Sequence, residues 1–213
     1  FIAGVNAGNS IQSGGNYNTV VGDEAGTAIT TGDQNVAIGF EAAKSLDTGA
    51  NIIAIGYQAG DALTSGENNI AIGKNALGAE DTHDFNIAIG SNALAAQNAG
   101  ADAYNIAIGH NAGLSVTTGV ENTLIGGLAG DALTTGGFSV AVGYEALSTE
   151  DAHGNNVAVG YKALKTLNAG ADGFNTAVGD HSGTSLTTGL NNTLIGGSSG
   201  DALTDADANT TVG

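Results

Sequence analysis

Asn35-Val36-Ala37-Ile38-Gly39 is the stretch that decides the fold, because variants of it recur along the whole chain. The motif returns at residues 86–90, 105–109, 122–126 and 156–160, and again at residues 209–213. Successive copies follow one another at a short and nearly constant spacing. Self-similarity at so short a period predicts a solenoid in which each copy forms one rung.

The last glycine of each motif, here called the marker glycine, defines about twelve rungs of 17 to 19 residues. It stands at positions 4, 22, 39, 56, 73, 90, 109, 126, 143, 160, 179, 196 and 213. The two longest steps carry similar inserts at residues 98–104 and 168–174. A longer period of four rungs is superimposed, since residues 60–64 return at 130–134 and 200–204. The pattern predicts one continuous domain over residues 1–213.

The composition suits a narrow, stacked interior. The chain has 36 Gly and no Pro, Cys, Met or Trp, and its hydrophobic fraction is 41% with only 5% aromatic residues. The core is therefore expected to consist of Ala, Val, Ile and Leu. The absence of cysteine excludes a disulfide framework.

The charge balance argues against several classes of partner. Formal net charge is −17, Arg is absent, and the only basic side chains besides histidine are Lys44, Lys74, Lys162 and Lys165. Nucleic acid is not an expected partner, because phosphate contacts need clustered Lys and Arg. No run reaches the roughly 18 apolar residues of a spanning helix, so we expect no membrane insertion by this segment.

Each motif is predicted to be a short strand that is apolar on both faces. One face carries β-branched residues such as Val36 and Ile38, and the other carries small residues such as Ala37. Adjacent rungs are expected to stack in parallel, about 4.8 Å apart. Because a solenoid strand normally shows one polar face to water, one of these faces needs a cover. Either the opposite wall of a flattened coil provides it, or neighbouring subunits approach closely over the small residues.

Three further positions recur within the rung. Asn stands four residues before the marker glycine in ten of twelve rungs, which predicts a ladder of side-chain hydrogen bonds inside the stack. The third residue after the marker is Ala in most rungs, which predicts an inward-pointing corner or second short strand. The tenth is usually Gly, which predicts a turn with positive φ, as at positions 32, 49, 66, 119, 136 and 189.

The Asn-x-Ala-Ile-Gly rungs resemble the head repeats of trimeric autotransporter adhesins (YadA-like heads) over the whole chain. The strings at residues 117–126 and 187–196, Thr-Thr-Gly-x-x-Asn-Thr-Leu-Ile-Gly, resemble repeat-rich bacteriophage tail-fibre proteins equally well. The resemblance implies a left-handed parallel β-roll that forms a homotrimer. The rung is longer than is typical of the adhesin heads, and no neck, stalk or anchor is visible.

The resemblance also implies a structural and adhesive function without turnover, in an extracellular fibre on a bacterial surface or a virion tail. The partners would be a host-surface glycan, a protein receptor or extracellular matrix. Binding is expected at the long inserts and turns, while Tyr104, Phe174 and Phe85 are expected to cover the rod edge or a subunit seam. Because the chain starts in mid-repeat without a visible signal peptide, we expect a piece of something longer.

Two repeated groups are candidates for ion binding or acid–base chemistry. Asp102 and Asp172, one in each insert, are the candidate metal ligands, since carboxylate and nearby amide oxygens suit Ca²⁺; a solvated loop is the alternative, and no other cofactor is expected. His83 and His153 occupy matching positions in successive four-rung blocks, each third after a glutamate. We expect them to be exposed turn residues, because acid–base chemistry needs a pocket and an oriented partner.

Other functions have less support in the sequence. An enzyme is not expected, because the paired carboxylates and basic residues of a polysaccharide-cleaving cleft are not apparent. A self-assembling filament subunit remains an alternative, because open strand edges invite end-to-end stacking. Ice binding is another, suggested by the Thr-Thr pairs at residues 30–31, 117–118, 134–135 and 187–188, although these skip rungs.

Overall fold

The structure, a computed structural model, describes residues 4–213. Within that range it has no α-helix and twelve β-strands of three residues, one at each motif from the second onward. Their bounds are β1 Thr19–Val21, β2 Val36–Ile38, β3 Ile53–Ile55, β4 Ile70–Ile72, β5 Ile87–Ile89, β6 Ile106–Ile108, β7 Thr123–Ile125, β8 Val140–Val142, β9 Val157–Val159, β10 Thr176–Val178, β11 Thr193–Ile195 and β12 Thr210–Val212. The chain is thus an all-β parallel solenoid, as the repeat predicted.

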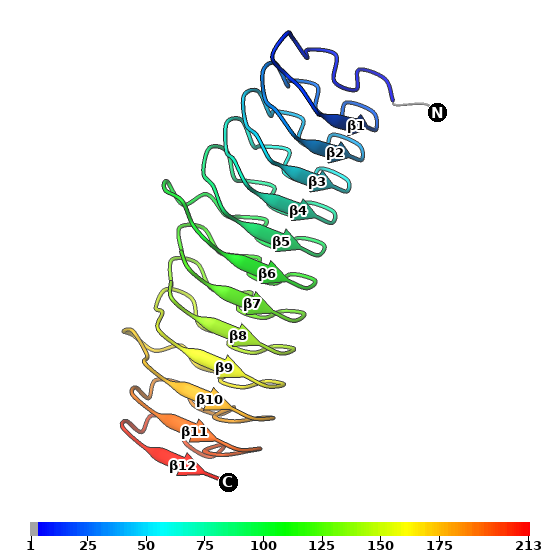
Figure 1. Cartoon of the computed structure of the whole chain (residues 1–213). Coiled ribbons are helices and arrows are strands. Elements are labelled where there is room, and N and C mark those ends of the chain that lie inside the picture. The colour runs from blue at the N-terminus through cyan, green and yellow to red at the C-terminus, as the bar shows by residue number, and fades with distance from the viewer. Residues whose placement is uncertain (1–3) are drawn as a thin grey trace.

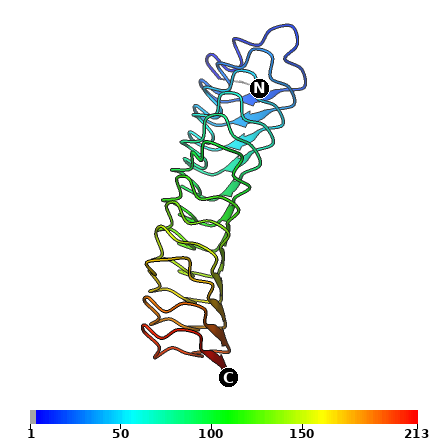
Figure 2. The ribbon, with the colours of Figure 1, turned by 90° about the vertical axis from the view of Figure 1, so that its left-hand side faces the viewer.

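The strands form a single sheet in sequence order, and every neighbouring pair is parallel. Ala37 of β2 pairs with Ala54 of β3, and Ala88 of β5 pairs with Ala107 of β6 across the first long insert. The motif therefore stays in register whether or not a rung carries an insert. Figure 1 shows the strands as steps of one stack, with β1 and β12 at opposite ends of the rod. Seen from the side, the stack bends gently along its length (Figure 2).

The asparagine ladder is confirmed. Asn35 is fully buried; its Nδ2 donates to the carbonyl of Gly49 at 2.9 Å, and its Oδ1 accepts from the backbone N of Ile52 at 2.9 Å. Asn105 makes the same two bonds, to Gly119 and Asn122. One amide therefore ties each strand to a turn in the next rung, and satisfies backbone groups that the short strands leave inside the stack.

The corner after each strand is a turn, not a second strand. Marker glycines 22 to 179 have φ between +131° and +143°, a conformation that favours glycine. A Cβ on Gly90 would lie 2.3 Å from the carbonyl oxygen of Gly109 in the next rung. The third residue, such as Ala93, is fully buried. The inward corner is confirmed, and the alternative of a second short strand is wrong.

The predicted positive φ at the tenth residue is wrong for glycines 32, 49, 66, 119, 136 and 189, although Gly100 has it. Gly32 and Gly119 do not have positive φ. Each needs glycine for a different reason, because a Cβ there would lie 2.3 Å from the carbonyl oxygen of the next rung's turn, at Gly49 and Gly136. Close stacking of turns, rather than a special backbone angle, excludes a side chain at these positions.

The small-residue face of the strands is the chain's own core. Ala37, Ala54 and Ala71 are fully buried, while the β-branched residues on either side of them are partly exposed. The opposite wall lies close, since a Cβ on Gly60 would be 3.6 Å from the Cβ of Ala71. Of the two covers considered for the small face, the flattened coil is therefore correct, and close approach of subunits over the alanines is wrong.

Candidate interaction face

The outward sides of the twelve strands form a face that we call the strand face. It consists of two columns, the first and third residues of each strand, and contains only Val, Ile and Thr. The third-residue column is Val or Ile at every rung. In a chain of net charge −17 no strand carries an ionisable side chain. The side chains are partly exposed, Ile108 by 36%, so the strand face is a long apolar surface of the type that marks contact sites.

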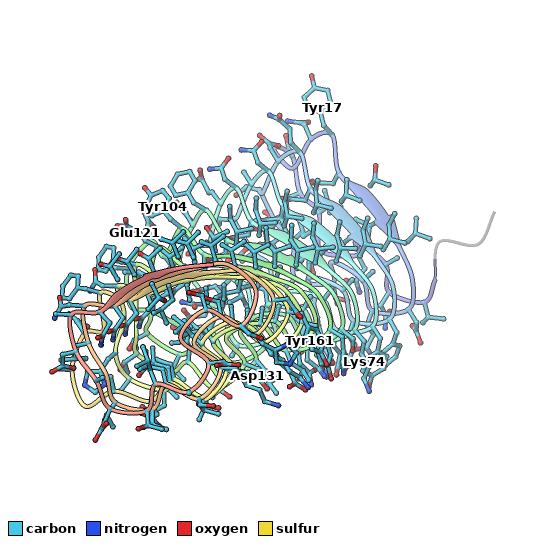
Figure 3. The ribbon with its side chains drawn as sticks, turned by 90° about the horizontal axis from the view of Figure 1, so that it is seen from below. Tyr17, Lys74, Tyr104, Glu121, Asp131 and Tyr161 are labelled. Atoms are coloured by element: carbon cyan, nitrogen blue, oxygen red, sulfur yellow. The ribbon has the colours of Figure 1, made fainter. Side chains whose placement is uncertain are left out.

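An aromatic column borders the strand face on the side where the strands begin. It occupies the position five residues before the marker glycine, and its exposed members are Tyr17, Phe85, Tyr104, Phe138 and Phe174. The rings of Phe85 and Tyr104 stack with centroids 5.0 Å apart and planes within 4°. In Figure 3, Tyr17, Tyr104 and Glu121 project from the same side of the rod. These rings lie at the rod edge, as expected for Tyr104, Phe174 and Phe85.

A second set of rings follows the marker glycine, beyond the other end of the strands. Phe40 stacks on Tyr57 with centroids 5.5 Å apart, and Tyr144 stacks on Tyr161 at 5.8 Å. Lysines lie over these rings, with Lys162 Nζ 4.8 Å from the Tyr161 centroid and Lys74 Nζ 5.9 Å from that of Tyr57. A carboxylate completes the group, since Lys162 Nζ also lies 3.9 Å from Glu145 Oε2.

Contacts between lysine, tyrosine and glutamate side chains shift the pKa values of these groups. The hydrogen bond to Glu145 raises the pKa of Tyr144, and the hydrogen bond to Tyr161 raises the pKa of Lys162. Lys44 pairs with Glu24 at 2.9 Å and with Glu41, and the bond from Lys44 lowers the Glu41 pKa. Each of these shifts favours the protonation state that the group already has near pH 7, so these groups hold the surface together rather than supply a proton.

The two histidine groups differ from the sequence-based expectation. His83 is half-buried, and its Nδ1 lies 2.8 Å from Oε1 of Glu80, which is fully buried. His153 lies beside Glu150 at a longer distance, with Nδ1 3.7 Å from Oε1, and no hydrogen bond joins the two side chains. The expectation of exposed turn residues is wrong, because each histidine lies against a carboxylate within the stack. Burial raises the pKa of the Glu150 carboxyl.

These glutamates occupy a column of core residues that the sequence analysis missed. The seventh residue after the marker glycine is Ile or Leu in most rungs, and Leu63, Leu133 and Leu167 there are fully buried. Glu80 and Glu150 replace leucine at this position. Their carboxylates accept from backbone, as in the bond from Ala169 N to Glu150 at 3.2 Å. The interruption of an aliphatic column was the signal available in the sequence.

The same groups contain donors that a metal ion could use. One ligand atom each of Glu80, Asp81 and His83 lie within 4.8 Å of one another, and Glu150, Asp151 and His153 are arranged likewise. Imidazole and carboxylate together suit Zn²⁺ and similar ions. Glu80 and His83 are joined by a hydrogen bond, whereas Glu80 Oε2 and His153 Nδ1 are buried without a hydrogen-bond partner among the described residues.

Asp102 and Asp172, the candidate calcium ligands, lie exposed in their inserts. Asp102 Oδ1 accepts from the backbone N of Asp84 at 3.3 Å, and Asp172 Oδ1 accepts from that of Gly154 at 3.0 Å. Each carboxylate thus ties its insert to the preceding rung. Within residues 4–213 neither one belongs to a cluster of acidic or histidine ligands.

The threonine pairs are used within the stack. Thr117 Oγ1 donates to the carbonyl of Thr134 at 3.1 Å, Thr134 Oγ1 to that of Asp151 at 2.7 Å, and Thr187 Oγ1 to that of Thr204 at 2.9 Å. Thr30 bonds similarly to the side chain of Asp47. These hydroxyls link consecutive turns, so they do not form a free flat array of the kind that an ice-binding surface would need.

No helix in the described part of the chain is long and apolar enough to cross a membrane. Comparisons with protein-family models, curated proteins and solved structures find no match to this chain.

Proposed function

We propose that the chain is a rigid segment of an extracellular trimeric fibre, which attaches its bearer to a surface. In this proposal the 17–19-residue rungs form a left-handed β-roll, and three copies pack their strand faces toward a common axis. The parent would be a bacterial adhesin or a phage tail fibre. No turnover is involved; the segment supplies length, stiffness and exposed turns.

The observation that carries the proposal is the uncharged Val, Ile and Thr composition of the strand face in a strongly acidic chain. Exposed apolar strips of this length are uncommon on monomers. Identical copies carry the same side chains at the same rung spacing, so their columns match along the full rod. Pairing with a second copy therefore removes apolar side chains from water at every rung.

The strand face supplies a narrow contact that is repeated along the rod. Eleven rung intervals of about 4.8 Å and three residues of about 3.3 Å give a face on the order of 500 Å². In a trimer each pair of chains would share about 500 Å² of this face, less than the roughly 1,200–2,000 Å² of a standard two-partner interface. The proposal therefore rests on the match of apolar side chains at every rung and not on contact area. The acidic turns, with their mutual repulsion, would then lie away from the axis.

The test places a charge on the strand face. Ile89 is partly exposed in the third-residue column of β5, so Ile89→Glu can reach water in a single chain. In a trimer the same substitution buries three carboxylates near one axis, which is strongly unfavourable. We expect light scattering to report trimers for the native chain and monomers for Ile89→Glu, both with the same circular dichroism spectrum.

Ser65→Glu is the matched control, since Ser65 is exposed in a turn away from the strands. It adds the same charge and should leave the trimer intact. If both variants keep the mass of the native chain, the strand face is not the contact surface.

A further inference from the structure

A notch interrupts the aromatic column beside the strand face. In four successive rungs, the position five residues before the marker glycine is occupied by Phe85, Tyr104, Glu121 and Phe138. All four side chains belong to exposed residues. A surface hollow of about 430 Å³ is lined by Tyr104 and Glu121, which Figure 3 shows next to each other on the outside of the rod. One ring, one carboxylate and a second ring thus follow each other along the column.

The orientation of Tyr104 follows from its stacking partner. Phe85 lies parallel to Tyr104 at 5.0 Å, nearly one rung spacing, and so covers one face of the tyrosine ring. The other face is turned toward the next rung, which carries Glu121. Phe138 stands one rung further on in the same column. The hollow is therefore lined by the tyrosine and by the glutamate, and a phenylalanine is the next member of the column.

The spacing lets one cation contact both Tyr104 and Glu121. The two residues are one rung apart, about 4.8 Å along the rod. A cation in the hollow that they line, within about 6 Å of the Tyr104 ring, would make a cation–π contact. The carboxylate of Glu121 would supply the opposite charge to the same cation, and Phe138 is the next ring of the column.

The chain builds this combination elsewhere from its own residues. Lys162 Nζ lies 4.8 Å from the Tyr161 ring and 3.9 Å from Glu145 Oε2. A ring and a carboxylate there hold one alkylammonium group. Tyr104 and Glu121 repeat the two acceptor groups, with a second ring added.

Within residues 4–213, no lysine forms an ion pair with the glutamate of the notch. Lys44, Lys162 and Lys165 pair with Glu24, Glu41 or Glu145, and Lys74 lies over Tyr57. Among the residues that the structure describes, Glu121 forms no ion pair. The positive group that matches the notch must therefore come from another molecule.

We propose that Tyr104, Glu121 and Phe138 form a binding site for an organic cation, an alkylammonium or quaternary ammonium group. Each chain holds one such site. In the second four-rung block the equivalent positions are Phe174, Asn191 and Ala208, which offer one ring and no carboxylate. The cation is either a free small molecule or the head of a lysine side chain on a partner surface. The site is defined within one chain and does not depend on trimer formation.

The experiment is a titration of the full chain with each probe, and calorimetry and proton NMR monitor the binding. The probes are tetramethylammonium chloride and the amide of N-acetyl-lysine, each at fixed low ionic strength because salt screens exposed charges. The neutral control is neopentyl alcohol, which has nearly the shape of tetramethylammonium. We expect one site per chain, upfield shifts of the probe's methyl protons from the rings, and no saturable binding of the alcohol. A preference for tetramethylammonium indicates a free cation; a preference for the lysine amide indicates a protein side chain.

Two variants test the residues. Glu121→Gln is expected to weaken binding of tetramethylammonium by about tenfold, as loss of a partnered charge does, and Tyr104→Ala should abolish the upfield shifts. Glu67→Gln, an exposed glutamate three rungs away, makes the same charge change and should leave affinity within about twofold.

The proposal is overturned if Glu121→Gln and Glu67→Gln weaken binding equally, since general attraction to an acidic surface would then suffice. Equal binding of neopentyl alcohol, or of many cations per chain, would overturn it too. Absence of any saturable binding to the folded native chain would also overturn the proposal. The mass of the chain, measured on the same samples, reports separately on the trimer.

Discussion

Leu124 occupies the space that glycine leaves at position 130. A Cβ on Gly130 would lie 2.7 Å from Leu124 Cδ2, and a Cβ on Gly113 would lie 2.8 Å from Leu124 Cδ1. Most other strands have alanine at the central position, and several of their corners carry a buried leucine, such as Leu77 and Leu147. In the narrow core one large residue thus packs against small ones. The large residue belongs to the strand wall in some rungs and to the opposite wall in others.

Changing the size of the side chain at position 124 or 130 should lower the stability of the chain by a predictable amount. Gly130→Ala should destabilise the chain by about 1–3 kcal/mol through overpacking against Leu124, and Leu124→Ala by about 2–5 kcal/mol through a cavity. The double variant should lose less than the sum, because the smaller side chain at 124 admits the new methyl group. Denaturant unfolding of the four proteins measures this coupling; strict additivity would show that the two residues do not share the space.

Two glycines with positive φ allow the cost of an unfavourable backbone angle to be distinguished from the cost of disturbing close stacking. Gly90 has φ +137° and a carbonyl oxygen 2.3 Å from the place of its Cβ, whereas Gly100 has φ +73° and nothing within 4 Å. Gly100→Ala should cost about 1 kcal/mol from the backbone alone. Gly90→Ala should cost several times more, or prevent folding, because adjacent rungs must separate. Thermal melting of both variants compares them directly, and equal losses would contradict close stacking as the cause.

The asparagine ladder has a natural gap that can be filled. Ser139 stands where ten other rungs have asparagine, and its hydroxyl lies 3.4 Å from the backbone N of Asn156. By analogy with Asn69, which donates to the carbonyl of His83 at 2.7 Å, Ser139→Asn should bond both Asn156 and His153. We expect a gain of about 1 kcal/mol in the free energy of unfolding. Asn105→Ala, the reverse change at an intact rung, should cost about 2 kcal/mol or more, since it leaves buried partners unsatisfied. Urea unfolding of both variants checks the signs, and a loss for Ser139→Asn would contradict the assigned role of the ladder.

The buried carboxyl of Glu150 makes stability depend on pH. Burial raises its pKa in the folded state, so the folded chain holds this proton at pH values where the unfolded chain has lost it. The stabilisation is complete below the unfolded value of about 4.3 and is lost as pH rises through the folded pKa.

Relative to Glu150→Gln, the native chain should therefore lose stability when the pH is raised from about 4 to 7. Urea unfolding at several pH values measures the difference. Glu67→Gln, the same substitution at an exposed site, is the control for the change in net charge. A parallel pH dependence of the native chain and Glu150→Gln would contradict the assignment.

The recurrence of Asn35 to Gly39 was enough to predict the parallel stack and the role of the asparagine, because each follows from period and residue type. It could not say which strand face is inside. Both faces of Val36-Ala37-Ile38 are apolar, and alternation is symmetric between them. The answer depends on the width of the coil, which leucine and glycine on the opposite wall determine.

The candidate sites depend still more on contacts between rungs. The reason for glycine at position 32 is a carbonyl in the next turn, and no local pattern reveals it. Glu150 could have been found as a break in the leucine column, had the seventh position been followed through all rungs. The notch at Glu121 needs the alignment of successive rungs and the stacking of Phe85 on Tyr104, which only coordinates supply.

The central claim is that the strand face is buried between copies of the chain, and sedimentation equilibrium of the native protein tests it most directly. One chain has a mass of 20.6 kDa. We predict a single species of three times this mass at micromolar concentration, with an intact β-sheet spectrum. A folded species of 20.6 kDa, stable at the same concentration, would contradict the account.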